Sequence, residues 1–289
     1  MTTRHHRGLR ARAAALLLAA AALTTAGTAD ASAAAAAPAA PGGWVETGSG
    51  TVNSLTGGEG LATRADGSVL YRGLGSIPLA LRIQGWNHVG DPDIARGDIF
   101  DAYQGGSNAT SKMFAVTTPS GQRYEYTHPL DPGEMLNNSF AAVSPDAQWL
   151  VSGEWGDENR LQVFPAPLLN PATPPTGGNL PQAGQITLDR TVNDIQGCDF
   201  VSPTRLLCSS DDPAKDLFQV DLPRPLDGTR TTGHVTTLFQ LPQRSICTGS
   251  FETEGIDYDP NTRLLRVEVI SPGICKVATG VYEYRPTTD

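Results

Sequence analysis

A short sequence unit returns five times along this chain, and the repetition constrains the fold more than any other feature. Each copy has a polar residue, an apolar run, a tight turn and a second apolar run. Self-similarity at a period of roughly 30 to 60 residues, built from hairpins, is typical of radial or stacked β-folds. The copies begin near Glu59, Asp91, Ser139, Gln196 and Glu254.

The hairpins extend into larger units, because runs of β-branched and aromatic residues follow them before the next copy begins. Four antiparallel strands make one propeller blade. The last copy stops after the run 281–284, and residues 44–47 offer a strand near the other end of the chain. We therefore predict an all-β protein, a β-propeller of five blades with four antiparallel strands each, closed by the N- and C-terminal strands in one blade.

Two alternatives to this fold stay open. A ring of six blades is one, because the first copy, 59–84, is a strand short. A β-sandwich has a similar number of strands, but it gives no reason for turns of the type Ser-Pro-Asp, Ser-Pro-Thr and Asp-Pro-Asn to recur at one place in three copies. The additional strand candidates are 113–117, 123–126, 161–164, 185–188, 217–220 and 235–239.

Residues 1–31 have the features of a secretory signal peptide. Four arginines precede the apolar stretch 13–22, and Ala29-Asp30-Ala31 offers a small-residue cleavage site. The apolar stretch is shorter than the roughly 20 residues that a membrane span needs. We expect 32–43, rich in Ala and Pro, to be a disordered tether. Residues 44–289 are expected to form one secreted, extracellular propeller domain without a membrane span.

Charge and cysteine content fit an exported protein. Removing the leader, with its four Arg and one Asp, takes the formal net charge from −9 to −12, which argues against a nucleic-acid partner. The four cysteines allow three disulfide pairings. Cys198 and Cys208 flank one hairpin turn, which favours their pairing and leaves Cys247 with Cys275. A zinc site would need closer spacing.

The polar residues that open the repeats predict a shared site. In a propeller the first strand of each blade lines the central channel, so these residues meet at one mouth of the axis. Carboxylate and amide oxygens suit Ca²⁺, and neighbouring carboxylates move each other's pKa values apart, as a proton-transfer pair requires. Binding of loop backbone and water is the alternative role. The ligand-binding candidates are Glu59, Asp91, Asn138, Gln196 and Glu254, and the catalytic candidates are His88, Asp91 and Asp194.

Two of the motifs resemble inner strands of the gluconolactonase and senescence-marker-protein propellers, and of phytase-like propellers. They are Gly57-Gly58-Glu59-Gly60 and the segment that starts at Glu254-Gly255. In the gluconolactonase group the acidic residue before Gly is a metal ligand, and Gln196-Gly197 stands where that group often has Asn-Gly. The resemblance implies that Glu59, Gln196 and Glu254 hold Ca²⁺ or another divalent cation. The wider segment 86–103 resembles secreted actinobacterial β-propeller proteins of no assigned function more closely.

Two functions are compatible with these observations. One is a monomeric binding or scaffold propeller that takes a small molecule or a glycan at its acidic axial site. The alternative is a divalent-cation-dependent hydrolase of lactones or phosphoesters, and a glycoside hydrolase with paired carboxylates is a third option. The sequence has no G-x-S-x-G, H-E-x-x-H or phosphate-cradling glycine motif, which favours the binding protein.

Overall fold

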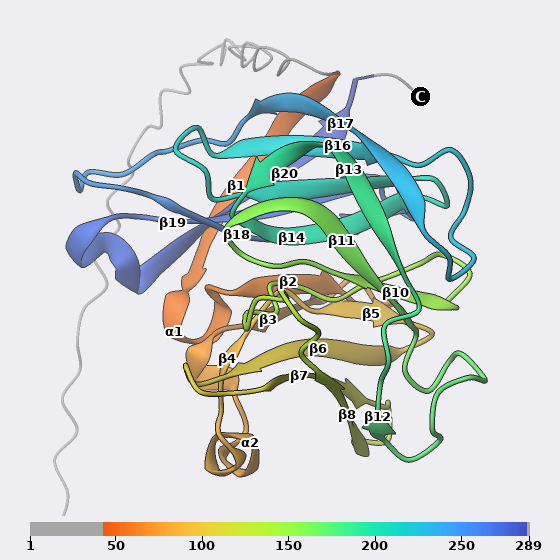
Figure 1. Ribbon diagram of the computed structural model, residues 1–289. Helices are drawn as coiled ribbons and strands as arrows, with labels where there is room; N and C mark the ends of the chain where they lie inside the picture. The colour runs from red at the N-terminus through yellow and green to blue at the C-terminus, as the bar shows by residue number, and fades with distance from the viewer. Residues whose placement is uncertain (1–42, 288–289) are drawn as a thin grey trace, which may run out of the picture. The chain divides into compact units, whose positions relative to one another are not determined.

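The computed structural model describes residues 43–287, which consist almost entirely of β-strands joined by turns and short helices (Figure 1). The predicted signal peptide and all but the last residue of the predicted tether lie outside the described residues. Within the described range, none of the helices has the length and apolar character that a membrane crossing requires. The helical segments are α1 (Ser54–Gly57), η1 (Leu74–Ser76), α2 (Leu79–Gln84) and η2 (Gly273–Val277).

The first and last strands of the domain share one sheet, whose order is β1–β20–β19–β18. β1 runs antiparallel to β20, with Trp44 opposite Pro286 and Asn53 opposite Ala278. The predicted closure by both ends of the chain is confirmed, and it gives the C-terminal strand a partner on each side. The strands are β1 (Trp44–Asn53), β18 (Glu252–Asp259), β19 (Leu264–Ile270) and β20 (Ala278–Pro286).

Two further four-stranded units join into one sheet of eight strands. Its order is β14–β15–β16–β17–β13–β11–β10–β9, and a short parallel pairing of β13 with β17 links the two units. The strands are β9 (Ala142–Val143), β10 (Trp149–Ser152), β11 (Asp157–Pro165), β13 (Gly184–Asn193), β14 (Ile195–Ser202), β15 (Arg205–Ser210), β16 (Asp216–Asp221) and β17 (Thr231–Gln240).

Residues 60–129, together with the short strand β12, supply one larger sheet and one hairpin. The sheet has the order β12–β8–β7–β6–β4, with β5 also paired to β6, and the hairpin is β2–β3. Between this hairpin and β4 the chain forms η1 and α2 instead of further strands. α2 follows Pro78 and ends at Gly85, which has a left-handed conformation. The strands are β2 (Gly60–Thr63), β3 (Val69–Arg72), β4 (Trp86–Val89), β5 (Asp93–Ala95), β6 (Asp98–Gly105), β7 (Ser111–Thr117), β8 (Arg123–Pro129) and β12 (Gly178–Asn179).

The innermost strands form a closed ring, which is the arrangement of a propeller. β18 contacts β2, β2 contacts β5, β5 contacts β9, β9 contacts β14, and β14 contacts β18. Figure 1 shows β18, β14 and β2 close to the centre of the domain. The all-β propeller prediction is confirmed. The number of blades stays a prediction, because the β2–β3 hairpin has only two strands.

Apolar clusters fill the spaces between the sheets, and two disulfides cross-link the chain. The largest cluster packs side chains of β9–β11, β13 and β14–β17 together, around residues such as Phe140, Leu161 and Phe218. The predicted disulfides are both formed: Cys198 bonds to Cys208 directly across the β14–β15 hairpin, and Cys247 bonds to Cys275.

Candidate functional site

Asp91 lies at the axis and ties the inner strands together. It is 1% exposed. Its Oδ1 accepts the backbone N–H of Leu61 at 3.0 Å, and its Oδ2 accepts that of Ile256 at 3.0 Å. Burial raises the pKa of Asp91 well above its ordinary value, although the two N–H donors act in the opposite direction. Asp91 therefore joins β2 to β18 and leaves neither oxygen without a partner.

This central carboxylate explains why glycine follows the polar residue in three of the repeats. A Cβ added to Gly60, Gly197 or Gly255 would lie 2.5, 2.4 or 2.2 Å from a carboxylate oxygen of Asp91. Those distances are far below a van der Waals contact. The glycines are needed for close approach, since none of the three has a positive φ.

A cluster of glutamates lies on the side of Asp91 where the inner strands begin. Glu254 is the third residue of β18 and is buried, and Glu59 directly precedes β2. Burial raises the pKa of Glu254 well above its ordinary value, and the charges of Glu59, Glu252, Asp211 and Glu268 raise it further. Glu59 and Glu254 are thus electrostatic neighbours, and their role as parts of one site stays a prediction.

Glu268 is the most unusual member of this cluster. It is 0% exposed on β19, and neither of its carboxylate oxygens has a hydrogen-bond partner in the described part of the chain. Burial raises its pKa well above the ordinary value, with further contributions from Asp91 and Glu59. A buried carboxyl group without partners is costly, so the site around it is suited to a ligand that satisfies these oxygens.

His88 lies beside Glu59 at this end of the axis. Its Nε2 lies 3.1 Å from Oε2 of Glu59, and its side chain is 38% exposed, whereas that of Glu59 is 15% exposed. The other ring nitrogen, Nδ1, is buried and has no partner among the described residues. A histidine held by a carboxylate at a solvent-accessible mouth has the geometry of a general base.

The remaining predicted site residues lie elsewhere or are already engaged. Gln196 is half-buried beside Gly197 at the axis. The side chain of Asn138 donates to the carbonyls of Tyr103 and Met113 and accepts from Ser152, so its role is to join strands. The backbone of Asp194 bonds to Gly156, and its carboxylate neighbours are Asp157 and Asp212, outside the glutamate cluster.

A second acidic layer follows two or three residues beyond the polar residues that open the repeats. Asp93 accepts the backbone N–H of Val143 at 2.6 Å, Asp199 that of Tyr258 at 2.6 Å, and Asp257 that of Thr63 at 2.8 Å. Each carboxylate therefore bonds to the backbone of the neighbouring blade.

Burial raises the pKa of all three carboxylates, and the charges of neighbouring aspartates raise those of Asp93 and Asp199 further. For Asp93 the value reaches about 6. Since each member already binds the next blade, this layer connects the blades.

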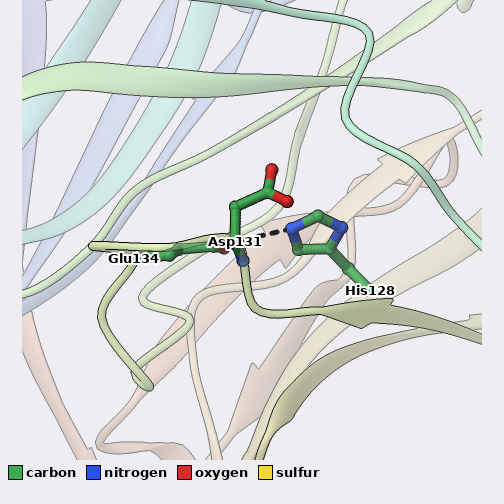
Figure 2. Close-up of side chains that lie close together, drawn as sticks. All are labelled: His128, Asp131 and Glu134. Atoms are coloured by element: carbon green, nitrogen blue, oxygen red, sulfur yellow. Dashed lines mark hydrogen bonds and ion pairs between the residues drawn. The ribbon is translucent and has the colours of Figure 1, made fainter.

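A third group, His128, Asp131 and Glu134, could hold a metal ion, because their ligand atoms lie within 4.8 Å of one another. Figure 2 shows the three side chains around the contact between His128 and Glu134, whose Nε2 and Oε2 are 2.9 Å apart. His128 Nδ1 faces the carbonyl of Leu180 at 3.0 Å, so both ring nitrogens have partners. Glu134 Oε2 also accepts the N–H of Asp131.

This group continues into a buried ion-pair network. Lys112 is fully buried, and its Nζ lies 2.9 Å from Glu134 and 2.8 Å from Glu154. Burial raises the pKa of Glu134, but the hydrogen bond from His128 and the charge of Lys112 outweigh it and hold that pKa well below its usual range. A cation here would meet the Lys112 ammonium. The network links β7 and β8 to β11 and the loop before it.

Glu59, His88 and Glu254 are candidates from the sequence pattern, whereas Glu268 is not. Glu268 lies between Val267 and Val269 in a strand that is not innermost, away from the positions that open the repeats. A lone acid inside an apolar strand is the signal that could have found it, since acids are almost never fully buried without a partner.

Comparison with known proteins adds little. No protein-family model matches the chain, and no curated protein matches it. Among solved structures, the periplasmic gluconolactonase PpgL of Pseudomonas aeruginosa is similar with a TM-score of 0.37 and 14% sequence identity, over 59% of this chain and 47% of that chain. The match therefore spans about half the length of that protein.

Proposed function

We propose that this protein is a secreted binding propeller that holds a divalent cation at its axial mouth through Glu59, Glu254 and Glu268. The cation would in turn coordinate an oxygen of a small ligand. The single observation that carries this proposal is Glu268, whose two buried oxygens have no partner in the described chain and lie beside other carboxylates.

The donor set fits the chemistry of a hard cation. Ca²⁺ takes six to eight oxygen ligands, and carboxylates supply them at low energetic cost when the ion neutralises their mutual repulsion. Three glutamates and the half-buried Gln196 amide offer such oxygens at one end of the axis. The His128 group is a weaker candidate, because Lys112 already neutralises it.

Secretion, a monomeric state and the lack of a nucleic-acid partner remain predictions from the sequence. The two disulfides support an oxidising, extracellular location.

Calorimetric titration with CaCl₂ tests the cation site. We expect one cation to bind the wild-type protein, and we expect Glu268→Gln, which keeps the shape but removes the charge, to weaken binding at least about tenfold. Glu125→Gln is the matched control, since Glu125 is partly exposed on β8 and pairs with Arg123. Binding that is absent, or that Glu268→Gln leaves unchanged, would remove the proposal.

A second candidate function is cation-dependent hydrolysis of a lactone or phosphoester. The contact of His88 with Glu59 favours it, because a carboxylate-oriented imidazole beside a cation could move the proton of an attacking water. A panel of lactones and phosphoesters assayed with and without Ca²⁺ tests this. Turnover that His88→Ala does not lower would exclude His88 as the base.

A further inference from the structure

A groove whose lining contains none of the axial site residues lies at the start of β4. It has a volume of about 480 Å³ and is bordered by the end of α2 and by the turn between β6 and β7. Trp86 lies opposite Gly105 in the β4–β6 pairing, which places the indole beside a strand position that has no side chain. Gly106 also lines the groove and also lacks a side chain.

The lining of the groove combines one aromatic ring with uncharged polar groups. Trp86 is half-buried and packs against the cluster of Val89, Tyr103 and Met113, so its ring is held in place. None of the residues that line the groove carries a charge. Its polar members are Gln84, Ser107, Asn108, Thr110 and Ser111.

This chemistry selects among classes of ligand. A fixed aromatic face needs a flat, weakly polar partner surface, and the surrounding amides and hydroxyls need a partner rich in hydrogen-bonding groups. A nucleotide would also stack on Trp86, but no cationic side chain in the groove would pair with its phosphates. The net charge of the chain, −9, would also repel them. An acyl chain would leave the polar lining without partners.

We propose that this groove binds one neutral pyranose unit of a glycan, with the C–H face of the sugar on the Trp86 indole and its hydroxyls on Gln84, Asn108 and Thr110. The proposal goes beyond the axial cation site and does not depend on it, because the groove residues contribute no carboxylate. Sugar binding therefore persists in EDTA, and cation binding persists when the groove is blocked.

Two substitutions change the groove by different routes. Trp86→Ala removes the stacking surface. Gly106→Leu fills the groove without backbone strain, because the φ of Gly106 is not positive and an added Cβ would come no closer than 3.7 Å to another atom, Nδ2 of Asn87. Trp155→Ala is the matched control, since this exposed indole lies outside the groove.

The test is a calorimetric titration of the full secreted chain in the presence of EDTA. The ligands are neutral cello-, xylo-, malto- and chito-oligosaccharides. We expect at least one series to bind, and we expect Trp86→Ala and Gly106→Leu each to weaken it at least about tenfold, with Trp155→Ala unchanged. Thermal unfolding of Gly106→Leu confirms folding. The proposal is overturned if no series binds, if binding requires Ca²⁺, or if the folded Gly106→Leu variant binds as tightly as the wild type.

Discussion

Replacing Glu158 by Gln should stabilise the protein at alkaline pH and lose that effect in acid. Glu158 lies on β11, is 6% exposed, and shares a hydrogen bond with Glu154, which already binds Lys112 and Arg160. Burial and then the charge of Glu154 raise the pKa of Glu158 from 4.5 to about 7. The folded protein thus keeps a proton that the unfolded chain releases.

The magnitude follows from these two pKa values. Stability falls by about 1.4 kcal/mol for each pH unit between them. The ionised Glu158 therefore costs the folded protein about 3 kcal/mol once the pH exceeds both values. Because the folded-state pKa is the higher one, this cost is absent below pH 4.5, grows as the pH rises and is complete above about pH 7. Gln keeps a donor for Glu154 and never ionises.

Urea unfolding without reductant, at several pH values across this window, measures the effect. The difference in unfolding free energy between Glu158→Gln and wild type should rise by about 3 kcal/mol from the acid to the alkaline end. Glu125→Gln, at a partly exposed carboxylate outside the network, is the control for a general effect of charge removal. A difference for Glu158→Gln that stays constant with pH would refute the reasoning.

Two further predictions address the axis and the buried network. Gly255→Ala should destabilise the protein by about 1 to 3 kcal/mol, because the new methyl group would overlap Asp91. Gly50→Ala is the control and should leave the stability unchanged, because an added Cβ there meets nothing within 4 Å. Equal unfolding midpoints for the Gly255→Ala and Gly50→Ala variants would contradict this account of the axis. Lys112→Met should cost about 3 to 5 kcal/mol, because it leaves two buried carboxylates without their ammonium. A variant as stable as wild type in urea would show that this network contributes little.

Local sequence patterns predicted the strands well. The candidates 113–117, 161–164 and 217–220 all fall inside observed strands, and 44–47 forms the start of β1. Strand formation depends on β-branched runs bounded by turn residues, and these are visible in a few neighbouring positions. The same locality made the Cys198–Cys208 disulfide predictable, since one hairpin turn sets both residues opposite each other.

The candidate site was predictable only in part. The repeat pattern predicted that Glu59 and Glu254 share one mouth of the axis, because equivalent positions of radial units converge there, and the charge of Glu59 does act on Glu254. The pattern did not reveal that Asp91 bonds to two neighbouring inner strands, so that its position in the ring is structural rather than open to a ligand.

The sequence by itself thus determined an all-β chain of repeated hairpins with acidic residues at their starts. Only the tertiary structure decided which of those acids are satisfied and which are not. Glu268 enters the proposed site because it is fully buried and neither of its carboxylate oxygens has a hydrogen-bond partner in the described part of the chain. The physical reason is that strand formation is encoded by neighbours in sequence, whereas the partners of a buried charge come from strands that are far apart along the chain.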